Sequence, residues 1–148
     1  MERTGLHFTL VTGDQKHHLA IAKGLSGIPI KTKFHRLQDC EKLMDYLSIN
    51  YSSEYHIVML DMDDPVNVGM ECLKAVRAKT AYNNLILIAY SRVEDEEVIK
   101  KIFIEGANIF FKYPKTASEF DSMLRQLIVI NWRVYSTGSD RQHFVLRM

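Results

Sequence analysis

Short apolar runs alternate along the chain with longer segments in which apolar residues recur at helical spacing. The apolar runs predict five strands, at residues 7–11, 30–36, 56–60, 85–89 and 109–111. The segments that follow them predict five helices, at about 15–25, from 40 onward, and at 67–79, 94–105 and 115–134. The central runs are largely apolar throughout, as expected of strands covered on both faces. The run at 30–36 alternates with lysines, which is typical of a half-buried edge strand.

This order of elements predicts an α/β fold: one doubly wound, five-stranded parallel sheet with helices on both faces and right-handed connections. Residues 1–135 are expected to form one domain. Residues 136–148 form a C-terminal tail, first polar and then apolar, that is either loose or packed on a neighbour. In such sheets ligands bind at the carboxyl ends of the strands, so the residues that end each strand are the candidate site residues.

The predicted helices carry caps and core-facing stripes. Asp14 and Asp39 precede two of them as N-caps, and Gly106 is expected to end the fourth helix. The stripes expected to face the core are Leu19, Ala22 and Leu25 in the first helix, and Val98, Ile99, Ile102 and Phe103 in the fourth. His17 and His18 are neighbours and point in different directions on a helix, which predicts a solvent-exposed face rather than a metal site.

Composition narrows the class of protein. The chain has 148 residues, of which 47% are hydrophobic, and a net charge of +1, so bulk electrostatic binding to nucleic acid or an anionic membrane is not expected. No apolar run approaches the roughly 18 residues of a membrane span, and residues 1–5 do not resemble a signal peptide. Cys40 and Cys72 lack the spacing of a metal site and are predicted to be buried, reduced thiols in a cytoplasmic protein.

Acidic residues follow the third predicted strand directly. Asp61 leaves that apolar strand and enters the loop that contains Asp63, Asp64 and Pro65. A carboxylate at this place can accept a phosphoryl group as an acyl phosphate, bind a divalent cation, or simply cap a loop. The residues around it are therefore needed to choose among these roles.

The spacing around Asp61 resembles that of the receiver domain of bacterial response regulators. Pro65 lies four positions after Asp61 and a glycine lies four positions further on, and the similarity extends over roughly residues 6–130. The resemblance implies a flavodoxin-like (βα)5 fold with Asp61 as the phosphoacceptor. It also implies that Ser91 hydrogen-bonds the phosphoryl group and that Phe110 is the aromatic switch residue that moves with it.

Two features depart from the family pattern. The family ends its first strand with two adjacent acids that hold a divalent cation, and here those positions carry Thr12 and Gly13. Asp14 reaches the second position only through a one-residue shift, so it is interpreted as a helix cap or as a third, peripheral acid. The family's lysine near the end of the fifth strand is replaced by Tyr113. Lys112 comes one position early and is expected to point to the opposite face of the sheet.

These departures weaken both sources of positive charge. Phosphoryl transfer to a carboxylate needs positive charge to neutralise the developing oxygens. Asp61, Asp63 and Asp14 are the candidate ligands of a Mg²⁺ ion, and Asp64 contributes through water. We therefore expect a poor cation site and slow or absent phosphorylation.

Three functions are compatible with these residues. The first is a non-enzymatic phosphorelay receiver, phosphorylated on Asp61 by a histidine kinase or a phosphotransfer protein. It would signal to a downstream protein, as a monomer or a homodimer, through the fourth helix, fifth strand and fifth helix, without contacting nucleic acid or membrane. The second is an atypical pseudo-receiver that binds proteins independently of phosphorylation.

The third is an enzyme of another class. Asp61 and Asp63 after an apolar strand, together with Ser91, also resemble motifs of haloacid-dehalogenase-type phosphatases. That family places its first motif near the start of its core and needs a later acidic pair. Here Asp61 belongs to the third predicted strand and nothing after residue 112 supplies the pair, so this is the least favoured of the three.

Overall fold

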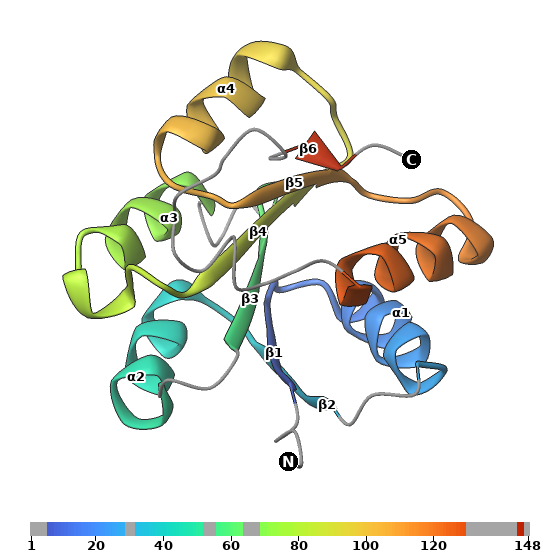
Figure 1. The fold of residues 1–148 in the computed structure, drawn as a ribbon, viewed down its shortest axis with the longest axis horizontal. Helices are drawn as coiled ribbons and strands as arrows, with labels where there is room; N and C mark the ends of the chain where they lie inside the picture. The colour runs from blue at the N-terminus through green and yellow to red at the C-terminus, as the bar shows by residue number, and fades with distance from the viewer. Residues whose placement is uncertain (1–5, 29–31, 52–55, 64–68, 130–144, 147–148) are drawn as a thin grey trace.

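The structure, a computed structural model, describes residues 6–28, 32–51, 56–63, 69–129 and 145–146. Its parallel sheet has the strand order β2-β1-β3-β4-β5-β6 (Figure 1). The strands are β1 (Leu6–Val11), β2 (Thr32–Leu37), β3 (His56–Asp61), β4 (Ile86–Ser91), β5 (Ile109–Lys112) and β6 (Val145–Leu146). The first five confirm the predicted strands. The sixth is a two-residue addition from the tail.

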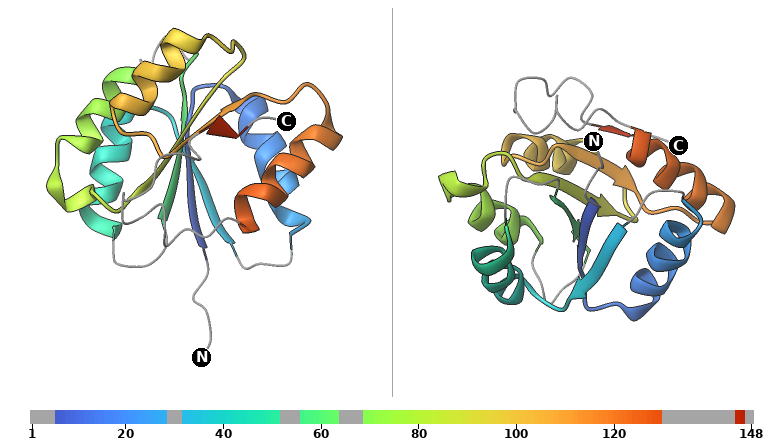
Figure 2. Two further views of the ribbon diagram at one scale, coloured as in Figure 1. Left: turned by 45° about the horizontal axis from the view of Figure 1, so that its top comes forward. Right: turned by 60° about the horizontal axis from the view of Figure 1, so that its bottom comes forward.

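Five α-helices cover the two faces of this sheet. They are α1 (Gln15–Ser26), α2 (Cys40–Asn50), α3 (Gly69–Arg77), α4 (Glu96–Ile104) and α5 (Ala117–Val129), with a short 3₁₀ helix, η1 (Thr80–Tyr82), after α3. Helices α1 and α5 lie on one face, and α2, α3 and α4 lie on the other (Figure 2). The predicted doubly wound arrangement is confirmed.

Alternation along the strands builds a core on each face of the sheet. In β3, Ile57 and Met59 point toward α1 and α5, whereas Val58 and Leu60 point toward the other three helices. All six residues of β3 are buried, as are all six of β4. Full burial of an aliphatic side chain such as Ile or Leu stabilises the folded state by about 1.5–3 kcal/mol. The two apolar clusters together therefore stabilise the register of the strands, and with it the positions of the strand ends.

The inward face of α1 differs in part from the predicted one. Leu25 is buried as predicted and Ala22 is partly buried, but Leu19 is 59% exposed, and the helix also buries His17 and Ile21. The buried residues recur every four positions, whereas the predicted stripe recurred every three. The prediction failed because it excluded a histidine from the core side, where His17 finds polar partners at the end of the sheet. In α4, Ile99 and Ile102 are buried as predicted, but Val98 is 45% exposed.

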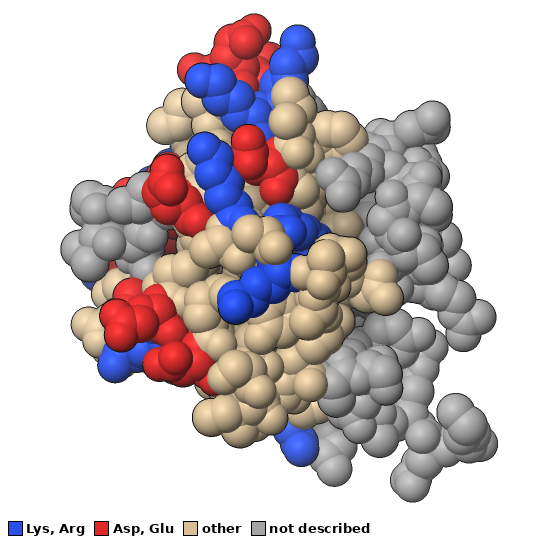
Figure 3. Space-filling view, turned by 90° about the vertical axis from the view of Figure 1, so that its left-hand side faces the viewer, with Lys and Arg blue, Asp and Glu red and all other residues tan. Residues whose placement is uncertain are grey.

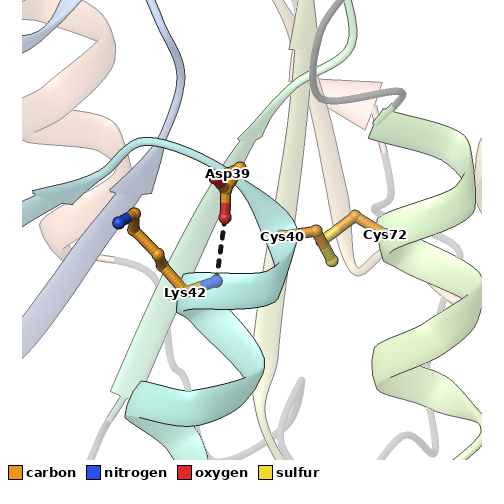
Figure 4. Close-up of a disulfide and its surroundings, with 4 residues drawn as sticks. All are labelled: Asp39, Cys40, Lys42 and Cys72. Atoms are coloured by element: carbon orange, nitrogen blue, oxygen red, sulfur yellow. Dashed lines mark hydrogen bonds between the residues drawn. A yellow bond between two sulfur atoms is a disulfide. The ribbon is translucent and has the colours of Figure 1, made fainter.

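The two cysteines are not reduced thiols as predicted. Cys40, the first residue of α2, and Cys72, in the first turn of α3, form a disulfide with their Cα atoms 5.6 Å apart (Figure 4). The two residues are 32 positions apart in the sequence, and the packing of α2 beside α3 brings them together. Neither the compartment of a protein nor the spacing of its cysteines along the sequence contains information on this contact.

The end of the tail adds a strand to the sheet. Val145 pairs with Phe110 and Leu146 pairs with Phe111, in parallel, on the outer edge of β5. The tail was predicted to be loose or to pack on a neighbour, and its residues 145–146 pair with β5 of the same chain. Among the described residues, no helix combines the length and the apolar character needed to cross a membrane.

Candidate functional site

Asp61 lies at the carboxyl end of β3, between the ends of β1 and β4. Its side chain is 4% exposed, and both carboxylate oxygens accept hydrogen bonds. The Thr12 hydroxyl donates to Oδ2 at 2.7 Å, and the backbone N–H of Asp63 donates to Oδ1 at 2.9 Å. Thr12 thus occupies the place where the resemblance expects the first acid. Its hydroxyl is neutral, so it supplies no negative charge to balance that of a cation.

His17 lies over the Asp61 carboxylate from the first turn of α1. Its Nδ1 is 3.4 Å from Asp61 Oδ2 and 2.8 Å from the hydroxyl of Tyr90, and its side chain is 5% exposed. Its Nε2 is 3.3 Å from Arg92 Nη2 and 3.5 Å from Asp14 Oδ2. A neutral ring with a proton on Nδ1 donates to Tyr90 and accepts from Arg92, whereas an imidazolium faces a carboxylate on each side.

The surroundings keep Asp61 ionised. Burial alone raises the pKa of this carboxyl. Hydrogen bonds from His17, from the Thr12 hydroxyl and from the Asp63 N–H, together with the attraction of His17, outweigh burial and hold the pKa below its ordinary value. Asp61 is therefore a carboxylate at neutral pH, with its charge matched by donors within the fold.

Tyr113 covers the imidazole of His17 from the side of β5. The two ring centroids are 4.4 Å apart, and Tyr113 also packs on Tyr90 at 5.5 Å. Burial, and then the charge of Asp14, raise the pKa of the Tyr113 phenol. Tyr113 packs on the apolar cluster that faces α1 and α5. Lys112 is exposed and lines an open groove together with Glu94, Tyr113 and Glu119, and its predicted orientation away from Asp61 stays a prediction.

Ser91 is engaged by Asp63 and not by Asp61. Its hydroxyl donates to Asp63 Oδ1 at 2.6 Å and accepts from the Val93 N–H at 3.0 Å. The second oxygen of Asp63 accepts from the Arg92 N–H at 2.7 Å. Asp63 therefore joins the residues after β3 to the β4–α4 loop, and this bridge uses both groups that the resemblance assigned to cation and phosphoryl binding.

Asp14 is a helix cap, as the ungapped interpretation expects. Its Oδ1 accepts from the Lys16 N–H at 2.8 Å, and its own N–H donates to the Thr12 hydroxyl at 3.0 Å. Its other oxygen faces Arg92, 3.7 Å from Nη2. Gly13, between Thr12 and Asp14, is exposed.

These residues do not fit the divalent cation that the fold family uses. Within the described parts of the chain, no three His, Cys, Asp or Glu side chains are placed to hold a metal ion. Asp63 is turned toward Ser91, and a guanidinium and an imidazole lie where Asp14 faces the site. Asp64, which was expected to contribute through water, lies outside the described residues.

Phe110 lies on the opposite face of the sheet from Asp61. It is 1% exposed and packs in the core cluster that includes Ile99 and Ile102 of α4. This is an inward position next to α4, and its assignment as a switch residue stays a prediction.

Sequence reasoning missed three members of this site: His17, Tyr90 and Arg92. Tyr90 and Arg92 flank the predicted Ser91, so their place at a strand end was available from the sequence. His17 stands three residues after the Asp14 cap, which puts it one helical turn from the same end of the sheet. No local pattern in the sequence indicated whether the first turn of this helix faces the strand ends or the solvent.

The pKa shift of Asp61 predicts how stability depends on pH. The folded-state pKa is below the unfolded one, so the stabilisation is complete above about pH 4 and is lost as the pH falls through the folded value. Asp61→Asn is expected to be less stable than the wild type at pH 7, with a difference that shrinks toward pH 3. Urea unfolding at several pH values measures this, with Asp45→Asn, an exposed position on α2, as the control.

Comparison with known proteins gives a likeness in structure. No model of a known protein family matches the chain, and no curated protein does. A phosphorylated cyanobacterial phytochrome response regulator superposes with a TM-score of 0.74 at 16% identity, covering 84% of this chain and 91% of its own. A red-light response regulator of R. palustris gives 0.74 at 19% identity, covering 82% and 90%. A response regulator receiver domain from Rhodospirillum rubrum gives 0.71 at 20% identity, also covering 82% and 90%.

These likenesses establish the receiver fold for this chain. The predicted flavodoxin-like arrangement of strands and helices is thereby confirmed. At such identities the likeness concerns the fold, and the chemistry at the strand ends has to be argued from the residues themselves.

Proposed function

We propose that this chain is an atypical receiver, a non-enzymatic protein-binding module whose signal does not depend on phosphorylation of Asp61. One observation carries the proposal: the Asp61 carboxylate is buried, accepts hydrogen bonds on both oxygens and lies beneath His17. A phosphoryl group approaching it would have to displace the imidazole and the Tyr113 ring packed on it. The charge that builds up on the transferred oxygens would then meet Tyr113 at the described end of β5, where the resemblance expects a lysine.

A surface for a protein partner lies around α4. Val93 and Ile104 are 66% and 68% exposed, and Val98 between them is 45% exposed. Figure 3 shows the face covered by α2, α3 and α4, where basic side chains lie interspersed with acidic ones rather than forming a continuous basic surface. Mixed charge with exposed apolar residues suits a protein partner better than nucleic acid.

The second candidate is the phosphorelay receiver, with Asp61 modified by a histidine kinase or a phosphotransfer protein. The observation in its favour is that Asp61 is ionised and has an imidazole 3.4 Å away, which can supply a positive charge when protonated. In that case the Ser91 hydroxyl would leave Asp63 and hydrogen-bond the phosphoryl group, and Phe110 would move together with Ser91. Both candidate functions use the same fold, and they differ in whether signalling requires phosphorylation of Asp61.

Intact mass after incubation with acetyl phosphate and Mg²⁺ separates the two candidates. We expect the wild-type chain to keep its mass, while a receiver domain with the acid pair and the lysine, treated alongside, gains one phosphoryl group. A gain in the wild type that disappears in Asp61→Asn would instead establish the phosphorelay receiver. The far-ultraviolet circular dichroism of each sample verifies that the fold is intact.

A further inference from the structure

We propose that Cys40 and Cys72 form a redox-active site that exchanges with small thiols of the glutathione class, and that its oxidation state controls the local mobility of Thr12 and Asp63, the two residues that donate to Asp61. The inference does not rest on the function proposed above. It rests on where the disulfide lies in the fold (Figure 4).

The disulfide joins two helices that each start at the carboxyl end of the sheet. Cys40 is the first residue of α2, after the Asp39 cap, whose carboxylate accepts from the Lys42 N–H at 2.9 Å. Cys72 lies in the first turn of α3. The bond therefore ties together the helix starts that follow β2 and β3.

Cys72, at one end of the disulfide, is connected to Asp61 through the start of α3. Gly69 begins α3 three residues before Cys72, and a Cβ on Gly69 would lie 2.9 Å from the Asp61 carbonyl oxygen and 2.7 Å from Met62 Sδ. The start of α3 thus packs directly against the backbone that leaves β3. A bond that holds Cys72 in place also holds this contact.

Cys40, at the other end, is connected to the Asp61 carboxylate through the end of β2. Leu37 ends β2 three residues before Cys40, and its carbonyl accepts from the Thr12 N–H at 3.2 Å. Thr12 in turn donates to Asp61. The disulfide is therefore connected to Asp61 by two routes, one through the start of α3 and one through the end of β2 and Thr12.

The two cysteines of the bond differ in exposure. Cys40 is partly exposed, whereas Cys72 is 2% exposed and packs in the core cluster beneath α2 and α3. An external thiolate can attack the sulfur of Cys40 and expel Cys72 as the leaving thiolate. Cys40 also lies at the positive end of the α2 dipole, which stabilises a thiolate formed there.

We expect the fold to form without the bond. Two apolar clusters cover the sheet, and a chain of this length buries enough surface to fold without a covalent cross-link. Removing the cross-link is therefore expected to loosen the region around it and to leave the architecture in place. This distinguishes the site from the disulfide of a small domain that cannot fold when reduced.

The exchange is balanced in two steps. A small thiolate attacks Cys40, giving a mixed disulfide and the Cys72 thiolate, and a second small thiolate attacks the mixed disulfide to release Cys40. In total, the protein disulfide and two small thiols give the protein dithiol and one small disulfide. The reverse reaction uses the small disulfide as the oxidant, so the compartment's thiol balance sets the state.

The test equilibrates the full-length native protein with mixtures of reduced and oxidised glutathione. Samples are quenched with N-ethylmaleimide and read by intact mass, where the dithiol carries two adducts and the disulfide carries none. We expect reversible interconversion without unfolding, a midpoint of thermal unfolding about 10 °C lower in the dithiol form, and amide exchange at Thr12 and Asp63 about threefold or more faster in that form.

The double variant Cys40→Ser/Cys72→Ser is the control, and it should show the dithiol exchange rates in every mixture. The proposal is overturned if no disulfide forms under excess oxidised glutathione, or if the reaction stops at a glutathione adduct on Cys40. It is equally overturned if the disulfide is reduced only after urea unfolds the chain, or if Thr12 and Asp63 exchange at the same rate in both states.

Discussion

Arg77→Met is expected to lower the free energy of unfolding by about 3–4 kcal/mol. The Arg77 guanidinium lies at the end of α3 and donates to three backbone carbonyls, those of Gly106, Tyr82 and Leu85, each at 2.8 Å. It also donates to the Asn108 side chain at 2.7 Å. One side chain thereby joins α3, η1 and the starts of β4 and β5.

The Arg77 contacts lie at a point where the backbone has little freedom. Gly106 has a φ of 112°, and a Cβ there would lie 2.7 Å from Arg77 Cγ, so the glycine permits both the turn and the close approach. The Asn108 oxygen also accepts from the Leu87 N–H at 2.8 Å, and Asn108 is 3% exposed. Methionine fills a similar volume and donates nothing, so these acceptors lose a charged donor.

Urea unfolding measures the effect of Arg77→Met, from the shift in midpoint at constant slope. Lys74→Met on the exposed side of α3 is the matched control, because it removes one positive charge from the same helix. Its effect should stay within about 0.5 kcal/mol. An equal loss in both variants would show that charge, rather than the hydrogen bonds of Arg77, determines stability here.

His17→Leu is expected to cost about 2–3 kcal/mol. The substitution removes the donor that faces Asp61 Oδ2 and leaves the Tyr90 hydroxyl, on a residue only 1% exposed, without its partner at 2.8 Å. Leucine has the bulk to fill the space under Tyr113, so the loss comes mainly from unmet polar groups. The Asp61 carboxylate keeps its hydrogen bonds from Thr12 and Asp63 but loses the imidazole, and this loss is expected to be the larger part of the cost.

His18→Leu is the matched control for His17→Leu. His18 is the neighbouring histidine, partly buried and stacked on Phe34 with ring centroids 5.3 Å apart. Its Nδ1 is buried and has no hydrogen-bond partner among the described residues, so leucine removes an unsatisfied atom. The change in stability should lie within about 0.5 kcal/mol, and it can be favourable. If both leucine variants lose equally, the contacts of His17 with Asp61 and Tyr90 have no special weight.

The strands and the orientation of the strand-end residues could be predicted because both follow from local alternation. Asp61 lies two residues after Met59, so both point to the α1 side, and the same counting from Phe111 places Tyr113 there and Lys112 opposite. Thr12 was identified as the replacement for an acid by position alone. Its hydrogen bond to Asp61 followed from the parallel pairing of β1 with β3.

The place of His17 could not be predicted in this way. Its burial depends on the hydroxyl of Tyr90, 73 positions later, and on an Asp61 carboxylate 44 positions later (61 − 17). A histidine next to another histidine on a short helix gives no local sign of either partner. The predicted stripe of α1 therefore excluded His17 and included Leu19, which is exposed.

The disulfide and the sixth strand were missed for the same physical reason. Cys40 and Cys72 meet because α2 and α3 are neighbours on one face of the sheet, which is a consequence of strand order. Val145 and Leu146 form too short a strand to be recognised by its pattern. Each depends on a contact between segments that are separated in the sequence and become neighbours only in the fold.

The central claim is that the Asp61 site is closed to a cation and a phosphoryl group, and the backbone amide NMR spectrum tests it most directly. The uniformly ¹⁵N-labelled wild-type chain is titrated with Mg²⁺ and then with beryllium fluoride, which mimics a phosphoryl group on a carboxylate. We predict that the amide signals of Asp61, Asp63 and Ser91 stay in place throughout. Saturable shifts centred on these three residues, absent in Asp61→Asn, would contradict the account and show an open phosphoacceptor site.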